Sequence, residues 1–257
     1  MNIYVVMKRT FDTEEKVEIK DGRVDEEGAE FVINPYDEYA IEEAIVLKEA
    51  HDGEVTVVTV GDEEAEKELR TALAMGADKA VLLDTEDLED EVDHYTISEM
   101  LNAFFKDKEY DIILGGNVAV DDGAGQVAPR LAELLDINQV TTITKLDIEG
   151  TKATIERDVE GDVEVVETEL PLLVTCQQGL NEPRYPSLPG IMKAKKKPLE
   201  TLDLDDLGLD EDELEAKTKT VDRFLPPEKQ AGKKLEGEPA EQVEELIKLL
   251  KTEAKVI

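Results

Sequence analysis

The chain has 257 residues, 40% of them hydrophobic, which is enough for one large α/β domain or a domain followed by an arm. With 64 acidic and 29 basic residues, the net charge of −35 argues against binding to nucleic acid or to an anionic membrane surface. A single cysteine, Cys176, excludes internal disulfides and a cysteine-based metal site, and two histidines argue against a histidine-based one. No apolar run approaches the roughly 18 residues of a membrane span. The N-terminus has no signal-peptide pattern, so we expect a cytoplasmic protein without membrane insertion.

The first half of the sequence alternates short apolar runs with amphipathic segments. The apolar runs predict buried strands at 3–7, 31–33, 54–60, 80–83 and 111–114. The amphipathic segments predict helices at 35–51, 63–75, 96–105 and 125–135. The resulting order predicts a doubly wound parallel sheet with right-handed crossovers. In such sheets ligands bind beyond the carboxyl ends of the strands.

Several residue types mark the predicted helix ends. Asn34 before Pro35 predicts an N-cap, and Gly76 predicts a left-handed C-cap. Thr96 with Glu99 matches the pattern of a capping box.

The second half of the sequence has a different pattern of apolar residues. Runs at 140–146, 151–157, 163–168 and 172–176 predict strands, with hairpin turns at 149–150 and 160–161, so we expect an antiparallel addition to the sheet. From residue 201 the chain is acidic and weakly patterned, and 240–251 predicts an amphipathic helix. We therefore expect a domain at 1–200 and a linker and arm at 201–257, the arm packing on a partner or on its own domain.

The segment 115–129 lies between a predicted strand and a predicted helix and is rich in glycine. Glycines let a backbone approach a ligand, and a helix N-terminus offers N–H groups to a phosphate. The segment matches neither the Walker nor the usual dinucleotide motif, so a nucleotide or phosphate site and a plain turn both stay open. Asp121 and Asp122 suit cap, ribose or structural contacts better than metal or acid–base chemistry. The sequence has no locally supported nucleophile and base, so we expect no catalytic residues.

The stretch 170–200 is the basic exception in an acidic chain. It combines a predicted buried strand, a loop with Pro183, Pro186 and Pro189, and lysines at 193 and 195–197. A stiffened loop that shows Tyr185 and Leu188 to solvent indicates a docking surface.

Three runs of this sequence closely resemble the beta subunits of electron transfer flavoproteins. They are ALAMGAD at 72–78, LNEPRY at 180–185 and LPGIMKAKKK at 188–197, and the match extends from residue 1 to about 200. The resemblance implies an adenine-nucleotide-binding type of α/β fold and a heterodimer with an alpha subunit that holds the redox-active FAD. It implies AMP in this chain, electron delivery from acyl-CoA and other flavin dehydrogenases, and transfer toward the respiratory chain.

Carried over by position, the resemblance implies two sets of site residues and no catalytic ones. The AMP contacts would come from Val6, Asn34, Pro35, Tyr36, Asp37, Val60, Gly116, Asn117, Val118, Ala119, Val120, Asp121, Asp122, Gly123, Ala124, Gly125, Gln126 and Val127. Dehydrogenase docking would use the loop 181–193, with Leu188 as its apolar anchor. Its docking residues would be Asn181, Glu182, Pro183, Arg184, Tyr185, Leu188, Ile191 and Met192.

The nucleotide segment departs from the family pattern at Gly123 and Ala124, where many relatives have an acid and a threonine. Side-chain phosphate contacts from these two positions cannot be carried over. We expect AMP, but a second FAD in an electron-bifurcating complex that uses NADH stays an alternative. A stand-alone adenine-nucleotide-binding or hydrolysing protein is disfavoured, because no phosphate-binding lysine follows the glycine-rich segment.

Overall fold

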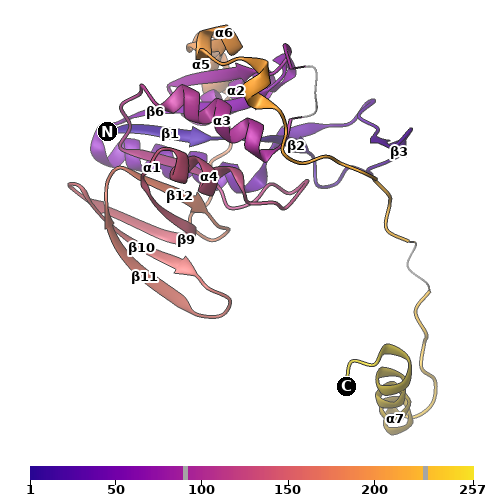
Figure 1. The fold of residues 1–257 in the computed structure, drawn as a ribbon. Coiled ribbons are helices and arrows are strands. Elements are labelled where there is room, and N and C mark those ends of the chain that lie inside the picture. Colours follow the sequence, from indigo (N-terminus) through magenta and orange to yellow (C-terminus); the bar gives the residue numbers. More distant parts are fainter. Residues whose placement is uncertain (89–91, 228–230) are drawn as a thin grey trace.

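The computed structural model describes residues 1–88, 92–227 and 231–257. A nine-stranded sheet runs through the described part of the chain (Figure 1), and its strand order is β11-β10-β9-β12-β8-β1-β6-β7-β13. Its strands are β1 (Asn2–Val6), β6 (Glu54–Gly61), β7 (Lys79–Asp84), β8 (Ile112–Gly116), β9 (Asn138–Glu149), β10 (Lys152–Asp158), β11 (Val163–Glu169), β12 (Leu172–Cys176) and β13 (Leu199–Leu202).

The remaining strands form two small antiparallel pairs beside the sheet. They are β2 (Arg9–Phe11) with β5 (Phe31–Ile33), and β3 (Ile19–Lys20) with β4 (Arg23–Val24). The turn of the second pair uses Asp21 and Gly22, both with positive φ, as a tight hairpin requires.

Helices cover both faces of the sheet. The helical elements of the described residues are α1 (Pro35–His51), η1 (Glu63–Ala65), α2 (Glu66–Met75), α3 (His94–Phe105), α4 (Val127–Leu134), α5 (Leu188–Ala194), α6 (Leu204–Leu207), η2 (Glu211–Leu214), α7 (Pro239–Leu249) and the π-helical turn η3 (Leu250–Ala254), of which α7 and η3 do not cover the sheet. Alternate residues of one strand enter opposite cores, because successive side chains point to opposite faces. In β8, Ile112 and Leu114 join the core beneath α1 and α2, whereas Ile113 joins the core beneath α3 and α4.

The doubly wound parallel sheet is confirmed, and the antiparallel addition is smaller than expected. Strands β9, β10 and β11 pair antiparallel, with turns at the two predicted hairpins. Strand β12, predicted within this addition, instead lies between β8 and β9 and pairs with both in parallel. All five of its side chains are buried, which suits a central parallel strand.

The packed domain continues past residue 200. Strand β13 adds to the sheet edge beside β7, and Leu204, Leu207 and Leu214 enter the core beneath α3. Beyond Leu214 the described chain runs outward to α7, which has no buried residue and stands apart from the body (Figure 1). No helix in the described residues is long and apolar enough to cross a membrane.

Two helix ends lie where we predicted them, but their capping interactions or backbone conformations differ from the prediction. Asn34 does precede α1, but its side chain makes no capping hydrogen bond. Gly76 does end α2, but with φ 150° and ψ −7° it is outside the left-handed helical region that we predicted. A Cβ at Gly76 would lie 3.0 Å from the Ile45 side chain, so close packing with α1 also favours glycine here.

The start of α3 was predicted wrongly. The cap is Asp93, whose carboxylate accepts the backbone N–H groups of Tyr95 and Thr96. Thr96 is buried in the first turn and donates its hydroxyl to the Leu214 carbonyl at 2.8 Å. A capping box at Thr96 is therefore excluded. Helix α4 also begins later than predicted, at Val127.

Candidate functional site

The carboxyl ends of β1, β6 and β8 lie side by side, because β1 pairs in parallel with both of its neighbours. A pocket opens there between the first turn of α3 and the segment that enters α4. It is lined by Val6, Met7, Lys8, Asn34, Asp37, Val60, His94, Ile97, Leu101, Gly115, Gly116, Asn117, Val118, Ala119, Asp122, Gly125, Gln126, Val127 and Ala128.

Asp37 joins three of the elements around the pocket. Its two carboxylate oxygens accept the backbone N–H groups of Lys8 and Gly116, each at 2.7 Å. Thus α1 is fastened to the ends of β1 and β8. Burial raises the pKa of Asp37 to about 7, although these two N–H groups act in the opposite direction.

Asn34 binds the segment that follows β8 and lines the pocket. Its amide donates to the Val118 carbonyl at 2.9 Å, and its oxygen accepts the Val120 N–H at 3.2 Å. Asn117 is bonded to Thr175 at the end of β12. The segment after β8 is therefore fixed from two elements that are distant in sequence.

Two glycines let the backbone run close to its neighbours here. A Cβ at Gly116 would lie 2.7 Å from the Tyr36 Cβ and would also meet the Asp37 carboxylate. A Cβ at Gly125 would lie 3.2 Å from the Asn117 carbonyl, and Gly125 has φ +58°. Any side chain at Gly116 would force these elements apart.

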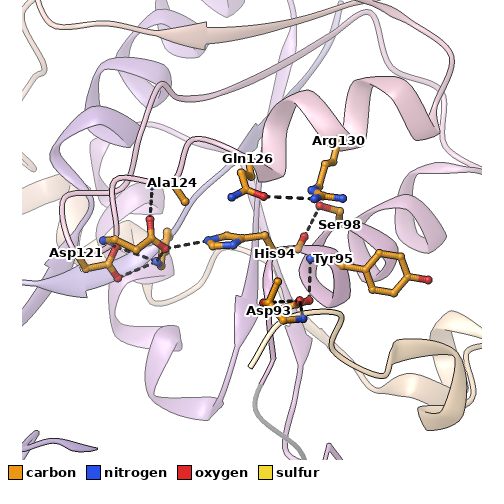
Figure 2. A network of polar contacts seen from close by, with 11 residues as sticks. Asp93, His94, Tyr95, Ser98, Asp121, Ala124, Gln126 and Arg130 are labelled. Carbon is orange, nitrogen blue, oxygen red and sulfur yellow. Dashed lines mark hydrogen bonds and ion pairs between the residues drawn. The ribbon is translucent and has the colours of Figure 1, made fainter. Parts of the chain in front are cut away.

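A charged cluster includes the pocket-lining residues Lys8, Asp122 and His94, and Figure 2 shows its network of polar contacts. The Lys8 ammonium contacts Asp121 at 2.8 Å and Asp122 at 2.9 Å. Asp122 also accepts the Ala124 N–H at 2.8 Å and lies 3.1 Å from His94 Nε2. The cluster ties β1, the glycine-rich segment and α3 together.

The pKa values in this cluster follow its geometry. Burial acts to raise the pKa of Asp122, but the Ala124 N–H, Lys8 and His94 outweigh it and lower the value to about 2. Burial acts to lower the pKa of Lys8, but its bonds to Asp121 and Asp122 outweigh it and raise the value. The carboxylate of Asp122 is therefore ionised and Lys8 is charged at neutral pH.

Most of the positions assigned to AMP by resemblance line this one pocket. The exceptions are Pro35, Tyr36, Val120, Asp121, Gly123 and Ala124, which support its walls or lie outside it. The assignment did not include the lining residues Met7, Lys8, His94, Ile97, Leu101, Gly115 and Ala128. The sequence did mark Gly115 and Ala128, because they belong to the glycine-rich segment 115–129, but it carried no signal for the residues of α3.

The other candidates for chemistry contribute little. Cys176 is fully buried, and burial raises its pKa well above the usual range, so the thiol is inert. Within the ranges described above, no group of three or more His, Cys, Asp or Glu side chains is placed to hold a metal ion.

The loop 181–193 is braced against α1. Arg184 forms a forked pair with Glu42, with a shortest contact of 2.8 Å, and also reaches Glu49 at 2.8 Å. Asn181 donates to the Tyr39 carbonyl at 3.0 Å and to Glu43 at 2.9 Å. Asn181 and Arg184 therefore point into the molecule and support the loop.

The apolar side chains of the same loop point outward. Tyr185 is 95% exposed, Leu188 73%, Met192 67% and Ile191 44%. A Cβ at Gly190 would lie 2.5 Å from the Ala74 carbonyl, so α5 packs closely on the end of α2. Four exposed apolar side chains on a braced support form a surface suited to docking.

The basic residues 193 and 195–197 lie at the end of α5 and directly after it, and one of them forms hydrogen bonds within the fold. Lys197 donates to the carbonyls of Leu73 and Ala77 at 2.9 and 2.5 Å, at the C-terminus of α2 where a cation is favoured. Lys193, Lys195 and Lys196 remain exposed. The positive charge available to a partner is therefore smaller than the sequence indicates.

Comparison with known proteins defines the class. A family model described as electron transfer flavoprotein domain matches residues 21–207, which include most of the sheet, most of the residues that line the pocket, and the braced loop. The electron transfer flavoprotein subunit beta of Bacillus subtilis (strain 168) is 70% identical over 257 residues, covering 100% of both chains. The subunits beta of Syntrophomonas wolfei and Homo sapiens are 42% and 36% identical, covering 100% and 92% of this chain and 98% and 93% of their own.

The chain belongs to the family of electron transfer flavoprotein beta subunits, and is an electron-carrier subunit. The resemblance in the runs at 72–78, 180–185 and 188–197 is thereby confirmed.

Proposed function

We propose that this chain pairs with an electron transfer flavoprotein alpha subunit, whose FAD is the redox group, in the cytoplasm. The pair accepts electrons from acyl-CoA and other flavin dehydrogenases and passes them toward the respiratory chain. The observation that carries this proposal is the braced loop with its exposed Leu188, in a chain 70% identical to a known beta subunit. Such a loop favours contact with a partner over chemistry of its own.

The two parts of the chain have different tasks in this proposal. The body, which extends to Leu214, holds the pocket and the loop. The arm ends in α7, whose stripe of Val243, Leu246 and Ile247 is exposed. An amphipathic helix without a buried face gains stability when its apolar stripe is covered. We propose that the alpha subunit covers it.

The residues of the pocket fit AMP. Val6, Val60 and Leu101 offer apolar contact to a base, and the acidic side chains beside Lys8 suit ribose hydroxyls. Lys8, Asp121 and Asp122 together carry a net charge of about −1. This charge disfavours placing the phosphate of AMP beside them. The first turn of α4 offers backbone N–H groups instead, with Gly125 leading into it. Gly123 and Ala124 would contribute only backbone contacts to AMP.

The docking part of the proposal is tested by Leu188→Ala in the complete heterodimer. We expect a loss of about 1–3 kcal/mol of binding to an acyl-CoA dehydrogenase, because a central apolar anchor is removed. The measurement is the dependence of the FAD reduction rate on dehydrogenase concentration. FAD content should not change. Val17→Ala, another exposed apolar side chain but remote in sequence from the loop, is the control. Equal rates for Leu188→Ala and the wild type would refute the anchor.

A further inference from the structure

The side chain of Asp93 joins two segments that are more than 120 residues apart in sequence. One oxygen accepts the N–H groups of Tyr95 and Thr96 at 2.9 and 3.0 Å, and so caps α3. The other oxygen accepts the N–H groups of Lys217 and Thr218 at 2.9 and 2.8 Å, and the Thr218 hydroxyl at 2.8 Å. Residues 217–218 follow η2 and begin the arm, so one carboxylate fixes the direction in which the arm leaves the body.

A second bond and a ring contact support this attachment. The buried hydroxyl of Thr96 donates to the Leu214 carbonyl at 2.8 Å, and the Lys217 ammonium lies 4.8 Å from the centre of the Tyr95 ring. Burial acts to raise the pKa of Asp93, but the N–H and hydroxyl groups bonded to it outweigh this and lower the value to about 2. The attachment therefore persists across the physiological pH range.

The same turn of α3 reaches the pocket. His94, the residue after Asp93, lines the pocket and places its Nε2 3.1 Å from the Asp122 carboxylate (Figure 2). The charges that face His94 from its neighbours are Asp122 and, through it, Lys8, which follows the end of β1. Ligand contacts with the glycine-rich segment would thus act directly on the first residue of α3.

We propose that the pocket and the arm are coupled through the first turn of α3, with His94 in contact with the nucleotide-binding segment and Asp93 holding the arm. This inference rests on the proposed function, since it assigns to bound AMP the task of ordering the arm. An occupied pocket fixes the loop at 121–125 and with it His94. A fixed helix start then lowers the entropy cost of holding residues 217–218 in place.

Thermodynamic linkage makes the coupling reciprocal. A change in the arm must therefore alter the affinity of the pocket for AMP. Thr218→Pro removes both the N–H and the hydroxyl that bond to Asp93, and Thr218 is not among the residues that line the pocket. Thr220→Pro makes the same replacement two residues along, at a position with no bond to Asp93. It is the matched control.

The experiment uses the full-length chain and AMP. Calorimetric titration should show about fivefold weaker AMP binding for Thr218→Pro, at the low end of the range for coupled sites, and no change for Thr220→Pro. In the wild type, AMP should slow hydrogen exchange at the Lys217 and Thr218 amides. If Thr218→Pro altered only the structure of the arm, its affinity for AMP would equal that of the wild type.

The outcomes separate the coupling from the function on which it rests. AMP that binds the wild type and Thr218→Pro equally, and leaves exchange at 217–218 unchanged, overturns the coupling and keeps the nucleotide site. A wild-type chain that binds no AMP overturns the nucleotide site and the coupling together.

Discussion

The backbone N–H of Gly116 donates to the Asp37 carboxylate at 2.7 Å, and the Tyr36 Cβ lies 2.7 Å from where a Gly116 side chain would begin. The end of β8 and the first turn of α1 therefore meet with no room for a Cβ. This close approach places the segment that follows Gly116 over the carboxyl ends of the strands, where the pocket lies.

Gly116→Ala should destabilise the fold and disturb the pocket. The added Cβ meets backbone and carboxylate atoms, which cannot move without opening the contact between α1 and β8, at a cost of about 1–3 kcal/mol. Urea unfolding measures the cost, and the AMP content of the purified protein measures the effect on the pocket. Gly232→Ala, at a glycine with open space around its Cβ, is the control. Equal stability of the two variants would contradict the account.

Asp37 should make stability depend on pH. Its native pKa of about 7 exceeds its ordinary value of 3.8, so the native state holds an extra proton between these values. The stability that this group contributes is complete below about pH 4 and is lost as the pH rises through 7. Asn at position 37 cannot titrate. The stability of the wild type relative to Asp37→Asn should therefore fall by up to about 4 kcal/mol between pH 4 and 7.5.

Urea unfolding of both proteins at several pH values measures this difference directly. The comparison cancels the contribution of the other acidic groups, because the two proteins share them. A difference in stability that stayed constant from pH 4 to 7.5 would show that Asp37 keeps its ordinary pKa in the fold.

Lys8→Met should weaken AMP binding. The change leaves Asp121 and Asp122 beside the pocket without the cation that lies 2.8 and 2.9 Å from them. The added repulsion of an anionic ligand is about 1 kcal/mol for exposed charges, or about fivefold in affinity, and should shrink in high salt. Titration with AMP at low and high salt measures it. Lys8→Arg keeps the charge and is the control, and the same low-salt affinity for both variants would refute the role of the cation.

Arg184→Ala should weaken docking without altering any of the exposed apolar side chains. It removes the forked pair with Glu42, whose side chain is only 8% exposed, and leaves that carboxylate without its charged partner, although the backbone N–H of residue 184 still donates to it. Because Arg184 itself is partly exposed, we expect a loss of about 1–3 kcal/mol in stability and a less ordered loop.

Urea unfolding and dehydrogenase-dependent FAD reduction measure the two effects of Arg184→Ala. The double variant Arg184→Met with Glu42→Gln removes both charges and should recover part of the stability. No gain in stability over Arg184→Ala would show that the ion pair does not brace the loop.

Local patterns in the sequence were sufficient for the parallel sheet and for the place of the pocket. Buried strands such as β6 are continuous apolar runs, and the ligand site of a doubly wound sheet follows from strand direction. The prolines around Leu188 predicted an exposed loop there, and the structure shows that side chain in solvent.

The predictions failed where a long-range contact decided between local alternatives. Asp93 and Thr96 are both acceptable caps, but only Asp93 also binds residues 217–218, and its place at the N-cap leaves Thr96 to bond Leu214. Strand β13 has only four residues, and its pairing with β7 decides its structure. His94 entered the pocket through the packing of α3, which no local pattern indicates.

The most direct test of the account is to identify the nucleotides in the complete complex. The chain is co-expressed with its alpha subunit, the purified heterodimer is denatured, and the released nucleotides are separated and quantified. We predict one FAD and one AMP for each heterodimer. Two FAD for each heterodimer, or no adenine nucleotide beyond one FAD, would contradict the AMP site at Gly116.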